Sequence, residues 1–496
     1  MEAKLEKNNN DTNILLVQAY EYFKQGNYLL TQDLCEKILS ENKNNAQAYS
    51  LIASCQLKKE MFSLAIESQK KAAELEPRNT EHLKNLELMY RKNKQFDKAL
   101  ETIRMVLEIH PSNPTYKYCE GLSLCHLWRI EEAIAVFEKV LFIDYFNVKA
   151  HVMLGNCYQE IGKYKEATAS FESAFAIDQS NSYIIYNRSL LLLLLGDFEQ
   201  GLKDYEARWQ QGPPLVLPNF VKNKPMWDGK DFSGKKLLIL MEQGHGDMIQ
   251  FCRYIPMAEK LGSDISVLCS DNLVNLLRPI APKAKWLTHQ DKIPEFDIYI
   301  TMMSMPLVFG TRIENIPAEV PYIFADDEHK LKWKKKIKDS DRKKIGLCWS
   351  GSKSHPKDHI RSVNPGRIEK FIRDNPIVDF YILEKGDGEK FAKKFANNLD
   401  NVFELGSEIR NFSDSAAIID KMDLVITVDT AVAHLAGAMA KPVWNLLLFN
   451  ADWRWLLNRD DSPWYPTMRL FRQKTRDDWK DVLNRVSDEL REYAKR

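Results

Sequence analysis

An aspartate and a threonine separate an apolar run from an alanine-rich stretch near the C-terminal end of the sequence. The apolar run is Leu424–Val428, Asp429 and Thr430 follow it, and Ala431 opens the alanine-rich stretch. Where a strand is followed by a helix, the first amides of the helix lack partners and the helix dipole favours negative charge. The pattern therefore predicts a phosphate site, although an ordinary strand–helix turn has the same residues. His434, one turn further, would contact the phosphate or a sugar hydroxyl, or would pack as a buried histidine.

A second aspartate, Asp247, follows a glycine-containing turn in the middle of the chain. Gly244, His245 and Gly246 form this turn, and the two glycines permit close approach of a ligand to the backbone. A carboxylate at the start of a helix accepts a proton from an incoming hydroxyl, which makes Asp247 the candidate general base. As a helix N-cap the same residue would need no catalytic role. Gly244, His245 and Gly246 are candidate donor-binding residues.

A loop rich in cations and hydroxyls follows the strand expected at residues 344–349. The loop begins at Trp349, carries Lys353 and Arg361, and ends at Ser362. The two cations would neutralise a leaving diphosphate without a metal ion, although a solvated basic loop has the same composition. Glu384, which follows the next expected strand, would accept hydrogen bonds from a nucleobase or a ribose, or would be an exposed acid in a turn. Trp349 and Glu384 complete the candidate donor-binding residues.

All of these residues follow apolar runs, and the runs determine how they are positioned. Short apolar runs at 236–241, 265–269 and 297–301 indicate buried parallel strands, with a helix expected over 248–261. A second alternation predicts strands at 344–349, 379–383, 424–428 and 443–448, an extended segment at 402–405, and helices at 365–374, 389–397 and 413–421. Parallel α/β sheets bind ligands at the C-terminal ends of their strands. The candidate loops are therefore expected to converge on a cleft between two facing Rossmann-like halves.

The first 211 residues repeat with a period of 34. One column of the repeat contains Asn45, Asn79, Asn113, Asn147 and Asn181, and other columns hold small or bulky residues. Small side chains let two antiparallel helices approach closely, and proline with asparagine is expected to close each unit. The pattern resembles the tetratricopeptide repeat and predicts six helix pairs, starting near residues 12, 47, 81, 115, 149 and 183. The predicted fold class is thus an α-helical solenoid followed by two α/β halves.

Three asparagines on the first helices of the repeats are candidates for acceptor binding. They are Asn85, Asn156 and Asn187. The concave face of such a solenoid suits an extended peptide or a partner helix, so these amides would bind a polypeptide backbone. Alternatively, they are merely solvated. No catalytic constellation is evident in this part of the sequence.

Length and composition indicate several soluble domains. The chain has 496 residues, 44% of them hydrophobic, and a net charge of +1, which gives no support for nucleic acid as a partner. The expected divisions are the repeats at 1–211, a linker at 212–235, an acceptor-side half at 236–342 and a donor-side half at 343–496. Eight cysteines without a CxxC motif indicate reduced thiols and no zinc site. With no signal peptide or membrane-spanning run, a cytoplasmic protein is expected.

Three segments together resemble the heptosyltransferase-related glycosyltransferases of the GT-B fold. They are Gly246–Asp247 after the first strand, the loop with Lys353, and Asp429–Ala436 with Lys441–Pro442. The segments at 452–457 and 461–466 are similar to those of bacterial proteins that join tetratricopeptide repeats to such a domain. The resemblance covers residues 236–475. It implies an inverting, metal-independent transfer from a nucleotide sugar, with Asp247 matching the family's catalytic acidic residue and Lys353 and residues 430–434 at the donor phosphates.

The favoured hypothesis is a protein glycosyltransferase whose repeats hold a polypeptide acceptor while Asp247 activates a serine or threonine hydroxyl. Flagellin-glycosylating enzymes have this arrangement, so flagellin is a plausible acceptor. No cofactor and no metal ion are expected. One alternative is a transferase that acts on lipopolysaccharide or another glycan. Another is an interaction scaffold whose transferase half is degenerate.

Overall fold

The computed structural model describes residues 2–212, 216–242 and 244–496, with side chains from residue 12 onward within those ranges. Contacts divide the chain into two compact units, Met1–Asp178 and Gln179–Arg496. This division and the expected end of the repeats at residue 211 differ by one helix pair. None of the described helices is long and apolar enough to cross a membrane.

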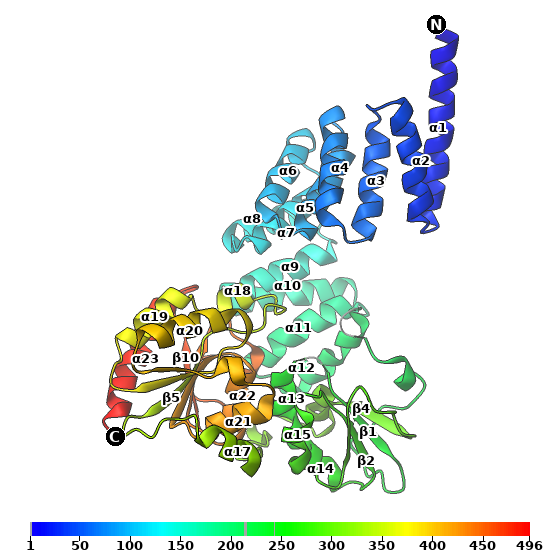
Figure 1. Cartoon of the computed structure of the whole chain (residues 1–496). Coiled ribbons are helices and arrows are strands. Elements are labelled where there is room, and N and C mark those ends of the chain that lie inside the picture. Colours follow the sequence, from blue (N-terminus) through cyan, green and yellow to red (C-terminus); the bar gives the residue numbers. More distant parts are fainter. Residues whose placement is uncertain (1, 213–215, 243) are drawn as a thin grey trace. The chain divides into compact units, whose positions relative to one another are not determined.

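Helix pairs form the described part of the first unit, which confirms the repeat architecture (Figure 1). The helices are α1 (Glu2–Lys24), α2 (Tyr28–Glu41), α3 (Ala46–Lys58), α4 (Phe62–Leu75), α5 (Thr80–Lys92), α6 (Phe96–Ile109), α7 (Pro114–His126), α8 (Ile130–Ile143), α9 (Val148–Glu160) and α10 (Tyr164–Ile177). The small-residue columns mark close contacts within a pair. A Cβ at Gly121 of α7 would lie 2.5 Å from the ring of Phe137 in α8.

The asparagine column has a physical cause at the first helix of each pair. Asn45, Asn79, Asn113 and Asn147 are N-caps whose side-chain oxygens accept hydrogen bonds from backbone amides. An N-cap satisfies amides that the helix itself leaves without partners. The asparagine therefore opens each pair, and the expectation that it closes the preceding unit was wrong.

The second unit begins with one more helix pair, α11 (Ser182–Leu195) and α12 (Phe198–Tyr205), followed by η1 (Glu206–Gln210). Asn181 caps α11 as the repeat pattern predicts. Phe198 of α12 packs against Trp453 and Trp464, with ring centroids 5.7 and 6.2 Å apart. The last helix pair therefore shares a core with the α/β part of the chain.

The first sheet has four parallel strands in the order β3-β2-β1-β4. The strands are β1 (Leu237–Leu240), β2 (Ile265–Leu268), β3 (Lys285–Leu287) and β4 (Ile298–Thr301), and the helices include α13 (His245–Phe251), α14 (Ile255–Glu259), α15 (Val274–Leu277) and α16 (Met305–Val308). The single helix expected over 248–261 was wrong. A 3-10 turn, η3 (Cys252–Tyr254), interrupts it. Pro256 lies in the first turn of α14, where a missing backbone N–H costs no hydrogen bond within the helix.

The second sheet has six parallel strands in the order β10-β9-β8-β5-β6-β7. They are β5 (Lys344–Cys348), β6 (Asp379–Ile382), β7 (Val402–Glu404), β8 (Leu424–Val428), β9 (Val443–Leu447) and β10 (Met468–Arg472). The helices are α17 (Asp327–Lys334), α18 (Asp358–Arg361), α19 (Pro365–Arg373), α20 (Glu389–Asn398), α21 (Phe412–Asp420), α22 (Ala431–Ala438) and α23 (Trp479–Ala494). Counted within this half, the strand order is that of doubly wound nucleotide-binding sheets.

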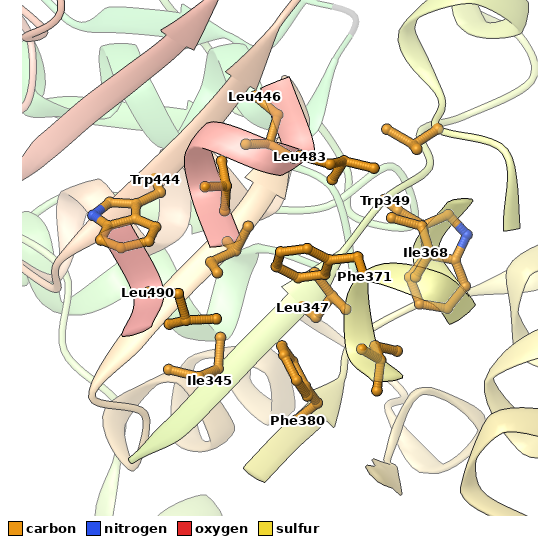
Figure 2. Close-up of a cluster of buried hydrophobic side chains, with 14 of the residues drawn as sticks. Ile345, Leu347, Trp349, Ile368, Phe371, Phe380, Trp444, Leu446, Leu483 and Leu490 are labelled. Atoms are coloured by element: carbon orange, nitrogen blue, oxygen red, sulfur yellow. The ribbon is translucent and has the colours of Figure 1, made fainter. Parts of the chain in front are cut away.

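The core of the second half lies between its sheet and one layer of helices. Figure 2 shows Ile345, Leu347 and Phe380 of the strands beside Phe371 of α19 and Leu490 of α23. Each fully buried side chain of this size contributes about 1.5–3 kcal/mol to folding. Helices α21 and α22 lie on the other side of the sheet (Figure 1). The core thus fixes the strand ends from which the candidate loops emerge.

Each sheet has one point where the strand order reverses, which is where open α/β sheets bind ligands. In the first sheet this point lies between β1 and β4, and in the second between β5 and β8. The residues that follow these four strands are therefore the ones to examine for a site.

Candidate active site

Asp247 lies in the first turn of α13 and is held by an arginine from the opposite half of the unit. Arg454 Nη2 donates a hydrogen bond of 2.7 Å to Asp247 Oδ1, and the aspartate side chain stays 26% exposed. The other carboxylate oxygen lies beside Gly244, where an added Cβ would stand 2.7 Å from Oδ2. Gly244 has φ of +94°, which side-chain-bearing residues rarely adopt. The glycine turn therefore makes room for the carboxylate as well as for backbone approach.

Arg454 belongs to η9 (Trp453–Trp455) and makes three polar contacts there. Besides Asp247, its Nε donates to Gln250 Oε1 at 2.9 Å, and its Nη1 donates to Asp452 Oδ1 at 2.8 Å. Sequence reasoning missed Arg454 and Asp452 as site residues. The available signal was an arginine between two tryptophans, but two of its three partners, Asp247 and Gln250, lie 207 and 204 positions away along the chain.

Burial and neighbouring carboxylates set the charge of this site. Desolvation raises the pKa of Asp247 to about 6, and Arg454 opposes the shift. Desolvation, with the nearby Asp452, likewise raises the pKa of Asp429 to about 6. Loss of hydration also acts on Asp452, but Arg454 outweighs it and holds the pKa of that carboxyl below its usual range. Two carboxyl groups near this junction thus titrate close to neutral pH.

The turn after β8 is joined to the loop after β5 by Arg361. Arg361 Nη1 donates to the backbone oxygen of Asp429 at 2.9 Å, and Nη2 donates to Asp358. Thr430 is the N-cap of α22, yet its hydroxyl makes no capping hydrogen bond and instead lies 3.1 Å from that of Thr427. Ala431, partly exposed, begins the helix. Arg361, Asp429, Thr430 and Ala431 therefore meet at the point where the strand order of the second sheet reverses.

His434 is a packing residue between α13 and α22. Its ring is 5% exposed, its Nδ1 lies 3.0 Å from the Tyr465 hydroxyl, and it stacks on Trp455. A Cβ at Gly246 of α13 would come within 2.9 Å of the His434 ring. Burial lowers the pKa of His434 to about 3, so the ring is neutral at physiological pH. Of the two alternatives from the sequence, the geometry favours the buried histidine.

Three of the expected donor-binding residues lie away from this cluster. Lys353 is 76% exposed and pairs with Asp387 on the surface. Trp349 is 1% exposed and packs in the core against Phe395. Glu384 is also 1% exposed, and its carboxylate accepts hydrogen bonds from the backbone of that loop, including the Ser350 amide at 2.8 Å. Desolvation raises the pKa of Glu384 to about 7. The structure thus gives Trp349 and Glu384 roles in shaping the loop.

His245 and the three asparagines each have surroundings of their own. His245 is exposed, its Nε2 lies 3.4 Å from the Ser270 hydroxyl, and its ring contacts Phe412. Asn85 and Asn156 lie half-buried on α5 and α9 of the first unit. Asn187, on α11 of the second unit, donates from Nδ2 to the Tyr183 carbonyl at 2.8 Å. Their proposed contact with an acceptor remains a prediction.

A second buried arginine, Arg208 of η1, occupies the reversal point of the first sheet. Its guanidinium forms two hydrogen bonds of 2.9 Å with Glu242, which follows β1. It also contacts Glu206 at 2.6 Å and Ser304, just after β4, at 2.8 Å. Arg208 is fully buried and Glu242 is 2% exposed. A helix that continues the repeats thus fills the place where an open sheet would take a ligand.

No group of three or more His, Cys, Asp or Glu side chains in the described ranges is arranged to hold a metal ion.

Models of two known families match different parts of the sequence. A tetratricopeptide repeat model matches residues 46–79 and 148–181. A model of glycosyltransferase family 9 (heptosyltransferase) matches residues 305–448. The chain carries a family 9 glycosyltransferase domain behind tetratricopeptide repeats. The family 9 match includes Arg361 and the turn at Asp429, whereas Asp247 and Arg454 lie outside it.

One relative is similar to this chain over a longer stretch than either family model matches. Protein FlbA of Caulobacter vibrioides is 27% identical over an alignment of 409 positions, which covers 75% of this chain and 66% of that protein. The match therefore spans slightly less than two thirds of the relative. Among solved structures, Pseudomonas aeruginosa pilF has a TM-score of 0.36 at 16% identity, covering 42% of this chain and 95% of its own. A tetratricopeptide repeat protein from Parabacteroides merdae has a TM-score of 0.38 at 19% identity, covering 41% and 81%.

Proposed function

We propose that the chain transfers a sugar from a nucleotide sugar to a hydroxyl acceptor, with inversion, without a metal ion and in a GT-B arrangement. The observation that carries the proposal is the packing of α13 against α22, because it brings the Asp247 helix beside the turn at Asp429 and Thr430. Base and phosphate candidates thus come from opposite halves of one compact unit. The family 9 match supports the same class of reaction.

In the proposed reaction Asp247 accepts the proton of the acceptor hydroxyl as the oxygen attacks the anomeric carbon of the donor. The bond between that carbon and the diphosphate oxygen breaks, and the nucleoside diphosphate leaves from the opposite face. Arg361 and the first amides of α22 would stabilise the charge that develops on the diphosphate. Lys353, at the exposed rim, would add charge only if its loop moves toward the donor.

A polypeptide with a serine or threonine hydroxyl is the proposed acceptor. The repeats support it, since solenoids of this kind bind extended peptides. Arg208 adds support, because it fills the reversal point of the first sheet with a group from the repeat-like helices. Flagellin is the acceptor to test first, given the resemblance to flagellin-modifying enzymes. A cytoplasmic reaction is part of the proposal and is supported by eight free cysteines.

The proposal is tested by incubating the full chain with radiolabelled UDP-, GDP-, ADP- and dTDP-sugars and a lysate of its own cell. Label in a protein band that withstands denaturation, and that is absent when Asp247→Asn replaces the wild type, would support it. If no nucleotide sugar labels any protein, the protein-acceptor proposal is wrong.

Transfer to a glycan is a second candidate, favoured by the heptosyltransferase description of the family 9 model. The same incubations distinguish the two, because label would then appear in the glycolipid or polysaccharide fraction and withstand protease. Label that protease releases as glycopeptide would exclude this second candidate.

A further inference from the structure

Arg454 links the two α/β halves at the proposed base. It lies on η9 after the second sheet, and two of its three acceptors, Asp247 and Gln250, lie on α13 after the first strand of the unit. The third, Asp452, is on its own segment. The arginine side chain is 8% exposed and Gln250 is fully buried. Such a fork of three hydrogen bonds allows the guanidinium little freedom.

Arg454 contacts one carboxylate oxygen of Asp247 and does not contact the other. Arg454 binds Oδ1 of Asp247, whereas Oδ2 lies beside Gly244, and the aspartate side chain as a whole is 26% exposed. A carboxylate held in this way presents a single oxygen in a fixed direction. A freely rotating aspartate would have to be ordered anew for each acceptor.

We infer that Arg454 is a positioning residue that orients Asp247 for proton transfer, with Oδ1 bound and Oδ2 directed to the acceptor hydroxyl. The inference rests on the proposed function, in which Asp247 is the base. Arg454 itself does not touch the reacting atoms in this account. Neither Arg454 nor Asp247 lies within the residues matched by the family 9 model.

The charge of Arg454 has a second consequence, because this guanidinium is in direct contact with Asp247 and the other charged groups with a large effect on Asp247 are acidic. The acidic groups are Asp452 on the same segment, Glu242 after β1 and Asp429 after β8. Tyr186 of α11 faces the same groups, and burial raises its pKa. His434 on α22 is neutral, since burial lowers its pKa to about 3. Arg208 on Glu242 and Arg361 at Asp429 are cations one group further away. Loss of Arg454 would remove the cation in direct contact with Asp247 and leave the three acidic groups in place, so the pKa of Asp247 would rise.

Arg253 provides a matched control, because it is another buried arginine of the same compact unit. Its Nη1 donates to the carbonyls of Pro317 and Trp464 at 2.9 Å each, and its Nη2 donates to the Tyr322 hydroxyl at 2.7 Å. It makes no ion pair with a carboxylate among the described residues. Substituting it removes packing and hydrogen bonds without changing the charge at Asp247.

The first experiment measures kcat/KM against pH for full-length wild type, Arg454→Gln, Arg454→Lys and Arg253→Lys, with the nucleotide sugar from the panel that supports transfer. The wild type should lose activity below about pH 6. In Arg454→Gln this loss of activity at acidic pH, the acid limb of the profile, should move to a pH about one to three units higher, because a close opposite charge shifts the pKa of a carboxyl group by about that amount. Arg454→Lys should keep the limb near its wild-type place and lower kcat, and Arg253→Lys should lower thermal stability without moving the limb. An unmoved limb in Arg454→Gln overturns the inference.

A second experiment needs no substrate and separates this inference from the proposed function. The unfolding temperatures of wild type, Asp247→Asn, Arg454→Gln and the double variant form a cycle. At pH 8 the effects of Asp247→Asn and Arg454→Gln on the unfolding temperature should be strongly non-additive. At pH 5, where Asp247 is protonated, the two effects should add. Additive effects at both pH values would show that the two residues are not coupled and would overturn the inference, whether or not any transfer is observed. Coupling without transfer would instead count against the proposed function.

Discussion

The residue that most constrains the site is Gly244, although it carries no functional group. A side chain there would be strained at a φ of +94° and would press on the second oxygen of Asp247. Both effects follow from a turn in which the backbone folds back over the first turn of α13. The absence of a side chain at Gly244 therefore allows both the backbone turn and the observed orientation of the Asp247 carboxylate.

Gly244→Ala should lower kcat/KM by more than its loss of stability explains. Gly234→Ala is the matched control, since Gly234 has φ of +79° and open space around its Cβ position. Each substitution should cost about 1–2 kcal/mol in the free energy of unfolding, because both impose a left-handed backbone. Urea denaturation and steady-state kinetics check this. Equal activity of the two variants would mean that Gly244 makes no room for Asp247.

Asp247 and His434 make opposite contributions to acid stability. The folded-state pKa of Asp247 is raised from 3.8 to about 6, so the folded protein binds the extra proton and gains stability as pH falls through this range. The folded-state pKa of His434 is lowered from 6.5 to about 3, so the unfolded chain binds the proton and stability falls below about pH 6.5.

Asp247→Asn removes the first contribution and keeps the second. Its unfolding temperature should therefore fall more steeply than that of the wild type between pH 7 and pH 4.5. His434→Gln should give the opposite result, a flatter profile. Calorimetry over this range checks both, and parallel profiles for all three proteins would contradict the account.

Among the elements, η1 is the one that joins the repeats' last helix pair to the first sheet. Arg208 is fully buried there and pairs with Glu242, which is 2% exposed, and with Glu206, which is 24% exposed. Removing one partner of a buried pair leaves an uncompensated charge, which costs more than the pair itself contributes. The geometry of the last helix pair thus depends on one side chain.

Arg208→Ala should lower the free energy of unfolding by about 3–5 kcal/mol. The control is Arg312→Ala, because Arg312 pairs with Glu199 of the neighbouring helix α12 but is 59% exposed. Loss of that exposed pair should cost no more than about 1 kcal/mol. Chemical denaturation of the full chain measures both values, and similar losses for the two variants would refute the assigned role.

Helices and strands could be predicted where the local sequence pattern determines them. Site residues could be predicted where they directly follow such an element. Leu424–Val428 is apolar throughout, and the structure has a strand there with the same bounds. Strand β3 was missed because only three residues pair and its first is an exposed lysine. Arg454 could not be assigned from the sequence, since its contact with Asp247 arises only when α13 and η9 pack together.

For the whole molecule, the division after Asp178 changes where a truncation should be made. A fragment of residues 179–496 keeps Arg208 with Glu242 and Phe198 with Trp453. It should unfold cooperatively and retain donor binding. A fragment of residues 212–496 loses these partners and should be unstable or insoluble. Circular dichroism melts of the two fragments check this, and equal stability would mean that α11 and α12 are dispensable to the second unit.

The central claim is that Asp247 performs the chemistry while other residues bind the donor. The most direct measurement compares wild type and Asp247→Asn for both transfer and donor binding, the latter by calorimetry with the active nucleotide sugar. The account predicts that transfer falls by about 10²–10⁴-fold while the Kd for the donor changes little. Undiminished transfer, or equal loss of donor binding, would contradict it, and a wild type that binds no nucleotide sugar would indicate a scaffold.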